Sequence, residues 1–155
     1  MKGHQLNSNQ AVEHMNTLFA GNNGIADVPI RLAFGAVFVA HGAQKLFGWW
    51  GGYGLEASGQ WMASIGLEPG LLMATLAGGI EFFGGFALIL GVLTRLVALV
   101  SSLLMLIALA LVHWSNGFFI GANGYEFALA LLAMSAYLSI AGSGRLSIDA
   151  IARKV

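Results

Sequence analysis

The stretch that decides the fold is residues 69–114, PGLLMATLAGGIEFFGGFALILGVLTRLVALVSSLLMLIALALVHW. It is apolar almost throughout, and its only acidic or basic side chains besides one histidine are Glu81 and Arg95. A helix that crosses a bilayer needs about 20 apolar residues. The stretch therefore predicts two spanning helices, 69–93 and 96–114. Because so few residues separate them, we expect a tight antiparallel hairpin.

Two further apolar stretches, 29–47 and 124–140, have the length of spanning helices. The sequence thus predicts an all-α membrane protein with a bundle of four transmembrane helices over residues 29–142. The polar residues 1–28 are expected to form a flexible N-terminal tail. Residues 143–155 are expected to form a C-terminal tail.

The composition agrees with a membrane protein. Of 155 residues, 57% are hydrophobic and 9% are charged, whereas soluble domains carry roughly a quarter charged residues. Seven basic residues balance seven acidic ones, so the chain lacks the basic surface expected of a nucleic-acid binder. The absence of cysteine excludes disulfides, thiolate metal sites and redox chemistry by a thiol of the protein itself. The expected partner is the lipid bilayer.

The connection 48–68 between the first two predicted helices is rich in aromatic residues and glycine. Tryptophan and tyrosine concentrate at membrane interfaces, so Trp49, Trp50 and Trp61 mark an interfacial segment. Residues 55–65 could form a short amphipathic helix on the membrane surface. We therefore expect a partly helical outer loop.

Basic residues predict the orientation, because they are retained on the cytoplasmic side. One side of the predicted bundle holds six of them, and the other holds Lys45 alone. The six are Lys2, Arg31, Arg95, Arg145, Arg153 and Lys154. Both termini are therefore expected to face the cytoplasm.

Ionisable side chains inside spans are costly in hydrocarbon, so they normally face other helices and find partners. His41, Gln44 and Lys45 lie at i, i+3 and i+4 and share one helix face. Small residues such as Gly78, Gly84 and Gly85 surround Glu81, which indicates close helix packing there. These small residues suit packing within the chain or in a homo-oligomer equally well.

His113 and Glu126 flank the predicted outer loop 115–123. Together with His41, Lys45 and Glu81 they predict a polar pocket in the outer half of the bundle. A structural interpretation stays open, in which Glu81 and Glu126 pair with Lys45, Arg95 or a histidine to hold helices in register. A metal or haem site is not expected, since the Glu-x-x-His spacing of di-iron bundles is absent.

An ordered set of motifs covers about residues 29–150. It comprises Arg31-x-x-x-Gly35 with Phe38, His41-Gly42-x-x-Lys45-Leu46, Glu81-x-x-Gly84-Gly85, Leu90-Gly91-x-x-Thr94-Arg95, His113, Asn123-Gly124-Tyr125-Glu126 and Gly142-x-Gly144-x-x-Ser147-x-Asp149. This set resembles the DoxX family of small bacterial inner-membrane proteins, which is related to the DoxD subunit of thiosulfate:quinone oxidoreductase.

The resemblance implies a multi-pass protein of the bacterial inner membrane that takes part in redox processes through quinones or through aromatic and sulfur compounds. The leading hypothesis is a quinone-linked oxidoreductase or a subunit of one, with quinone as cofactor and a redox protein as partner. The residues expected to act in catalysis are His41, Glu81, His113 and Glu126. Those expected to bind the quinone are Gln44, Lys45, Trp49, Trp50 and Tyr125.

Two alternatives remain at this point. The first is a binding or transport module for a small aromatic or sulfur compound. The second is a structural or assembly subunit of a membrane complex, in which the polar network only fixes helix packing.

Overall fold

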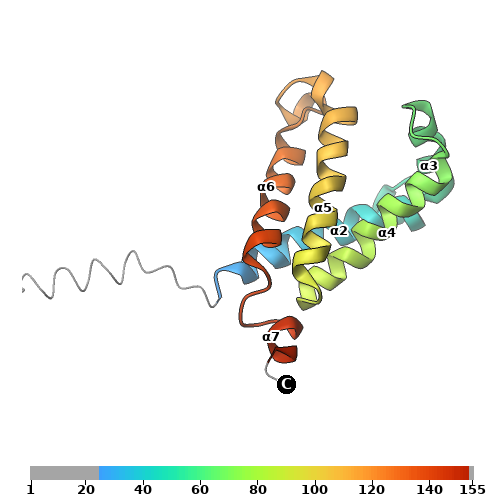
Figure 1. Ribbon diagram of the computed structural model, residues 1–155. Coiled ribbons are helices and arrows are strands. Elements are labelled where there is room, and N and C mark those ends of the chain that lie inside the picture. Colours follow the sequence, from blue (N-terminus) through green and yellow to red (C-terminus); the bar gives the residue numbers. More distant parts are fainter. Residues whose placement is uncertain (1–24, 154–155) are drawn as a thin grey trace, which may run out of the picture.

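The computed structural model describes residues 25–153, and within that range every regular element is a helix (Figure 1). The predicted all-helical class is thereby confirmed for the described part of the chain. Four long helices occupy the four apolar stretches. They are α2 (Asp27–Phe47), α4 (Gly70–Leu90), α5 (Thr94–Ala108) and α6 (Glu126–Ala141). Residues 1–24, which make up most of the predicted N-terminal tail, lie outside the described residues.

Short helices fill the connections between the long ones. The aromatic connection between α2 and α4 contains η1 (Trp49–Gly51) and α3 (Gly54–Ser64). Beyond α5 the chain continues through η2 (Leu109–His113), a π-helical turn. The remaining short elements are η3 (Trp114–Asn116), η4 (Ile120–Ala122) and α7 (Ile148–Ala152).

Two helical segments are long and apolar enough to cross a membrane. They are Gly70–Leu90, with 21 residues, and Thr94–Asn116, with 23 residues. Helix α6 is apolar but has only 16 residues. Helix α2 has 21 residues and carries Asp27, Arg31 and Lys45. The described residues thus hold two of the four predicted spans on these criteria, and a bilayer crossing by α2 and α6 stays a prediction.

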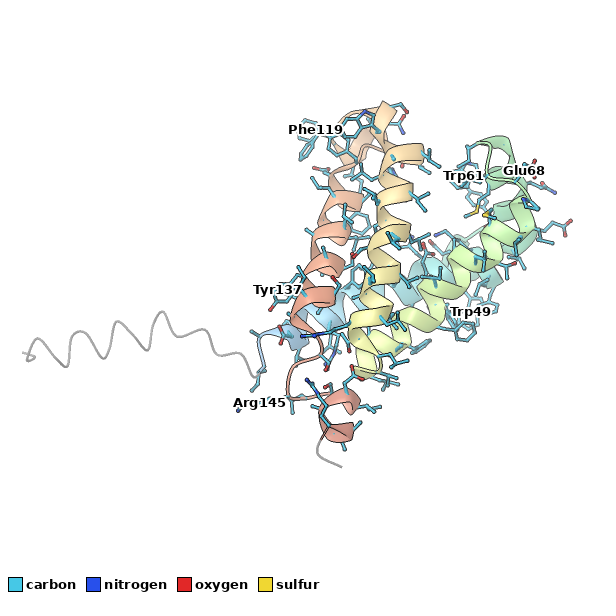
Figure 2. All side chains as sticks on the ribbon, viewed as in Figure 1. Trp49, Trp61, Glu68, Phe119, Tyr137 and Arg145 are labelled. Atoms are coloured by element: carbon cyan, nitrogen blue, oxygen red, sulfur yellow. The ribbon has the colours of Figure 1, made fainter. Side chains whose placement is uncertain are left out.

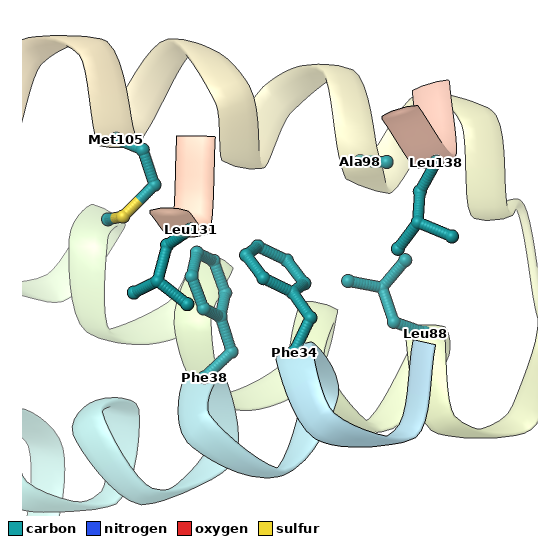
Figure 3. Packing of buried hydrophobic residues seen from close by; sticks show 7 residues of the cluster. All are labelled: Phe34, Phe38, Leu88, Ala98, Met105, Leu131 and Leu138. Carbon is teal, nitrogen blue, oxygen red and sulfur yellow. The ribbon is translucent and has the colours of Figure 1, made fainter. Parts of the chain in front are cut away.

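The long helices pack mainly as two pairs, α2 with α4 and α5 with α6. The first pair runs obliquely to the second (Figure 1). A cluster of buried apolar side chains joins the pairs, and in it the rings of Phe34 and Phe38 lie 4.2 Å apart between their centroids. The other members come from α4, α5 and α6 and are shown in Figure 3: Leu88, Ala98, Met105, Leu131 and Leu138.

Glycines allow α2 and α4 to approach at backbone distance. A Cβ atom added to Gly42 would lie 2.4 Å from the amide nitrogen of Phe82 and 2.8 Å from the carbonyl oxygen of Gly78. At the next contact, a Cβ on Gly35 would lie 2.7 Å from the carbonyl oxygen of Gly85. Two of the small residues predicted to pack, Gly78 and Gly85, therefore serve a contact within the chain.

The segment after α6 packs back onto the bundle, although the sequence suggests a tail there. The guanidinium of Arg31, which is buried, donates to the carbonyl oxygens of Ser143 and Leu146. The carboxylate of Asp149 in α7 accepts hydrogen bonds from the amides of Leu93 and Thr94, at 2.8 and 2.9 Å. Residues 143–153 thus fasten α2 to the turn between α4 and α5.

Candidate functional site

A cavity of about 370 Å³ lies between the two helix pairs, with α3 forming one of its walls. Trp61 lies on the side of α3 that faces α5 (Figure 2). The wall is apolar except for a few side chains, and several of its apolar residues are exposed at the surface of the chain. Ligand pockets share this combination of an apolar wall with a few polar groups, and span about 300–1,000 Å³.

Four of the predicted site residues line this cavity: His41, Lys45, Glu81 and His113. The first two are in α2, Glu81 is in α4, and His113 ends the π-helical turn that follows α5. Helices far apart in sequence thus bring their ionisable side chains to one space.

Lys45 and Glu81 form an ion pair inside the wall. The Nζ atom of Lys45 lies 2.7 and 2.9 Å from the two carboxylate oxygens of Glu81. Glu81 is only 5% exposed, and a carboxylate in such a place is very costly unless an opposite charge and hydrogen bonds compensate it. The close approach of α2 to α4 at Gly42 and Gly78 brings the two side chains within reach.

His41 lines the cavity and is exposed at the surface of the chain. Its ring centroid is 6.2 Å from that of Phe127 in α6, and the two rings are tilted by 46°. Among residues 25–153 no hydrogen bond fixes the His41 ring, so either of its nitrogen atoms can carry the proton.

The ring of His113 is held by the loop that follows it. Its Nδ1 atom lies 3.0 Å from the carbonyl oxygen of Asn123. The same carbonyl accepts a hydrogen bond of 3.3 Å from the side-chain nitrogen Nδ2 of Asn116. This nitrogen also donates to the carbonyl oxygen of Val112. The loop therefore fixes both the position and the direction of the His113 side chain.

Five other predicted site residues lie outside the cavity wall. Glu126 is the first residue of α6, and its carboxylate accepts a 2.6 Å bond from the amide of Ile120. Tyr125 stacks on Trp114 with 5.2 Å between ring centroids. These two residues close the loop 115–123 on itself.

Gln44, Trp49 and Trp50 lie at the C-terminal end of α2 and just beyond it. The side chain of Gln44 donates to the carbonyl oxygen of Trp50 at 3.5 Å. The Trp49 ring packs against Phe47 and Phe82, with centroid distances of 5.1 and 6.3 Å. This aromatic group is exposed on the outside of the chain, as expected of an interfacial anchor.

Reasoning from the sequence missed the apolar half of the wall. It includes Phe127 and three methionines, Met62, Met73 and Met105. Met73 and Ala77 are four residues apart and share a face with Glu81, so helical periodicity could have found them. Met62 sits on α3, whose packing against α4 depends on the contact between Gly59 and Gly70.

Among residues 25–153 no three His, Asp or Glu side chains come close enough together to hold a metal ion. The carboxylate of Glu81 already has an ammonium partner in Lys45.

Within the described residues, two helices are long and apolar enough to cross a membrane, and a buried carboxylate with its ammonium partner lines the cavity between all-helical elements. The sequence pattern of the DoxX family matches residues 26–114. The chain belongs to the DoxX family, whose members are membrane-associated.

Two curated relatives extend the similarity over most of the chain. A Bacillus subtilis (strain 168) protein named "Putative oxidoreductase CatD" is 31% identical over 125 residues, which are 81% of this chain and 85% of the relative. An uncharacterized protein of Haemophilus influenzae is 29% identical over 135 residues, or 86% of this chain and 87% of the relative. No solved structure matches the chain.

Proposed function

We propose that the protein is a quinone-linked redox subunit of the bacterial inner membrane. The observation that carries this proposal is the convergence of His41, Lys45, Glu81 and His113 on one apolar cavity. The oxidoreductase name of the Bacillus subtilis relative supports the reaction class. The proposal includes four spanning helices, with both termini in the cytoplasm and the loop 115–123 outside.

The lining of the cavity supports the proposal of a quinone. A quinone supplies two-electron chemistry coupled to the uptake or release of two protons. Its ring needs a few polar partners for two oxygen atoms, and its tail needs an apolar path. The ionisable residues provide the partners, while apolar side chains such as Met73, Leu76 and Leu111 provide the path.

Each ionisable residue has a role that its position permits. His41 and His113 exchange hydrogen bonds and protons with the ring oxygens. The ammonium of Lys45 offsets negative charge that develops on an oxygen, and Glu81 keeps that ammonium in place. Glu126 and Tyr125 shape the loop that holds His113. Electrons pass to or from a partner redox protein.

Ligand binding to the purified protein in lipid nanodiscs tests this proposal. The probe is a ubiquinone with a decyl tail, and the signal is the quenching of tryptophan fluorescence, to which Trp61 contributes from the cavity wall. We expect saturable binding that Ala108→Phe weakens by about tenfold or more, because the larger ring fills the cavity.

Leu103→Phe is the matched control, since Leu103 lies in the same helix, is 55% exposed and does not line the cavity. Its affinity should stay within about twofold of the wild type. Equal weakening by both variants, or no saturable binding at all, would contradict the proposed site.

A second function is favoured by the aromatic side chains in the wall. Phe38, Trp61 and Phe127 could hold a small aromatic compound by ring packing, without redox change. Anaerobic absorption spectra separate the two functions. The quinone proposal expects a bound quinone to be reduced when an electron donor is added, whereas a binding module leaves its spectrum unchanged.

A further inference from the structure

We propose that the cavity selects the hydroxyl form of its ring compound, the quinol, over the quinone, and that His113 makes the selection. This inference rests on the proposed function, because it concerns the same cavity. It follows from the hydrogen-bond direction that the loop imposes on one ring nitrogen.

The bond between His113 and Asn123 has only one possible direction. A carbonyl oxygen accepts and never donates, so the Nδ1 atom of His113, at 3.0 Å, must carry the hydrogen. In the neutral imidazole the Nε2 atom then has a free lone pair and is an acceptor. Among residues 25–153 this Nε2 atom has no hydrogen-bond partner.

The loop favours the tautomer of His113 that carries its hydrogen on Nδ1. The backbone of Asn123 is left-handed, with φ 60°, and its carbonyl also accepts from Asn116. The amide of Tyr125 donates to the carbonyl of Gly117 at 3.0 Å, which closes the loop between these two residues. Within the described residues no donor is hydrogen-bonded to Nδ1, and the acceptor is left on the side of the ring that the loop does not use.

The π-helical turn Leu109–His113 brings His113 to the cavity wall. A π-turn inserts one residue into a helix and is often found at functional sites. It places Leu111, Val112 and His113 in the cavity wall together. An uninterrupted α-helix would send one of these three consecutive side chains away from the cavity.

Helix α2 supplies the complementary group to the same cavity. Lys45 has three N–H bonds, and two of them point to the carboxylate oxygens of Glu81. One donor remains for a ligand oxygen. A quinol oxygen both donates and accepts, so it satisfies His113 and Lys45 alike, whereas a quinone carbonyl only accepts and leaves the Nε2 atom of His113 without a partner.

His41 cannot make this distinction. No hydrogen bond from the described residues fixes its ring, so its tautomer can adapt to either form of the ligand. The selection therefore depends on His113, and the residues around Asn123 act as positioning residues.

The test compares three probes in nanodiscs that share one ring and one decyl tail: decyl-ubiquinol, decyl-ubiquinone and the dimethyl ether of the quinol, which lacks the donor. We expect the quinol to bind about tenfold more tightly than either of the others. His113→Phe should remove this difference, whereas His41→Phe should weaken quinol and quinone equally. Nitrogen-15 spectra of histidine-labelled protein should show the hydrogen of neutral His113 on Nδ1.

The outcomes separate the inference from the proposed function. Equal affinity for the quinol and its dimethyl ether, or a hydrogen on Nε2 of His113, overturns the selection and leaves quinone binding intact. A quinol preference that survives in His113→Phe overturns the role of this residue. Failure of all three probes to bind overturns the proposed function, and the inference with it.

Discussion

At the scale of single residues, we expect the loss of the ion pair between Lys45 and Glu81 to lower the stability of the protein most. Lys45→Met leaves the carboxylate of Glu81 buried without its partner, and breaking a buried pair in this way costs about 3–5 kcal/mol. We expect the free energy of unfolding, measured by detergent titration in micelles, to fall by about 3 kcal/mol.

The double variant Lys45→Met with Glu81→Leu separates the charge effect from a packing effect. It removes both charges and leaves apolar side chains of similar size, so it should regain most of the lost stability. A double variant as unstable as Lys45→Met alone would show that the pair contributes packing rather than charge compensation.

At the scale of helices, the contact of α2 with α4 depends on the absence of a side chain at Gly42. A methyl group there would meet the backbone of Phe82 at 2.4 Å, which only a shift of one helix can relieve. Gly42→Ala should therefore lower the free energy of unfolding by about 1–3 kcal/mol. It should also disturb the pair of Lys45 and Glu81, which the same contact brings together.

Gly79→Ala is the control for this prediction. Gly79 lies in α4 beside Gly78, and a Cβ atom added to it would meet nothing within 4 Å. Its stability in the same detergent titration should be unchanged or slightly higher, since alanine favours a helix over glycine. Similar losses in the two variants would contradict a specific backbone contact at Gly42.

Helical periodicity in the sequence predicts much of this arrangement, because side chains three or four residues apart lie on the same face of a helix. It places His41, Lys45 and Glu81 on inward faces, and all three line the cavity. It extends the second helix to residue 93, whereas α4 ends at Leu90 because Gly91 turns left-handed, with φ 70°.

Other features depend on local backbone geometry that the periodic pattern of apolar residues does not show. The π-helical turn that ends at His113 shifts the side chains after it, and the uniformly apolar residues 103–112 give no sign of it in the sequence. Glu126 is the first residue of α6, where its carboxylate meets the Ile120 amide instead of the cavity. His113 and Glu126 both belong to the family motifs, and the motifs do not show which of the two lines the cavity.

At the scale of the whole molecule, Asp149 joins the C-terminal segment to the start of α5. Burial alone would raise the pKa of Asp149, but hydrogen bonds from the Thr94 and Leu93 amides, together with the charge of Arg153, outweigh it and lower the pKa below its ordinary value. A pKa lowered by folding adds stability that is complete above the unfolded-state pKa of about 3.9 and is lost as the pH falls through the folded-state value.

Unfolding measured from pH 7 down to about pH 3 checks this linkage, with Asp149→Asn as the comparison. The asparagine variant should be less stable at neutral pH and should lose less stability on acidification than the wild type. Parallel pH profiles for the two proteins would exclude a contribution from this carboxylate.

The hydrogen bond from the Thr94 amide to Asp149 also affects the order in which the helices assemble during synthesis. Helix α5 begins at Thr94, yet the side chain that caps its first amide lies 55 residues later in the chain. No local side chain caps that end, so its amides remain without this acceptor until Asp149 has left the ribosome. We therefore expect the turn between α4 and α5 to reach its final form only after α6 has been synthesised, which makes the docking of α7 a late step of assembly.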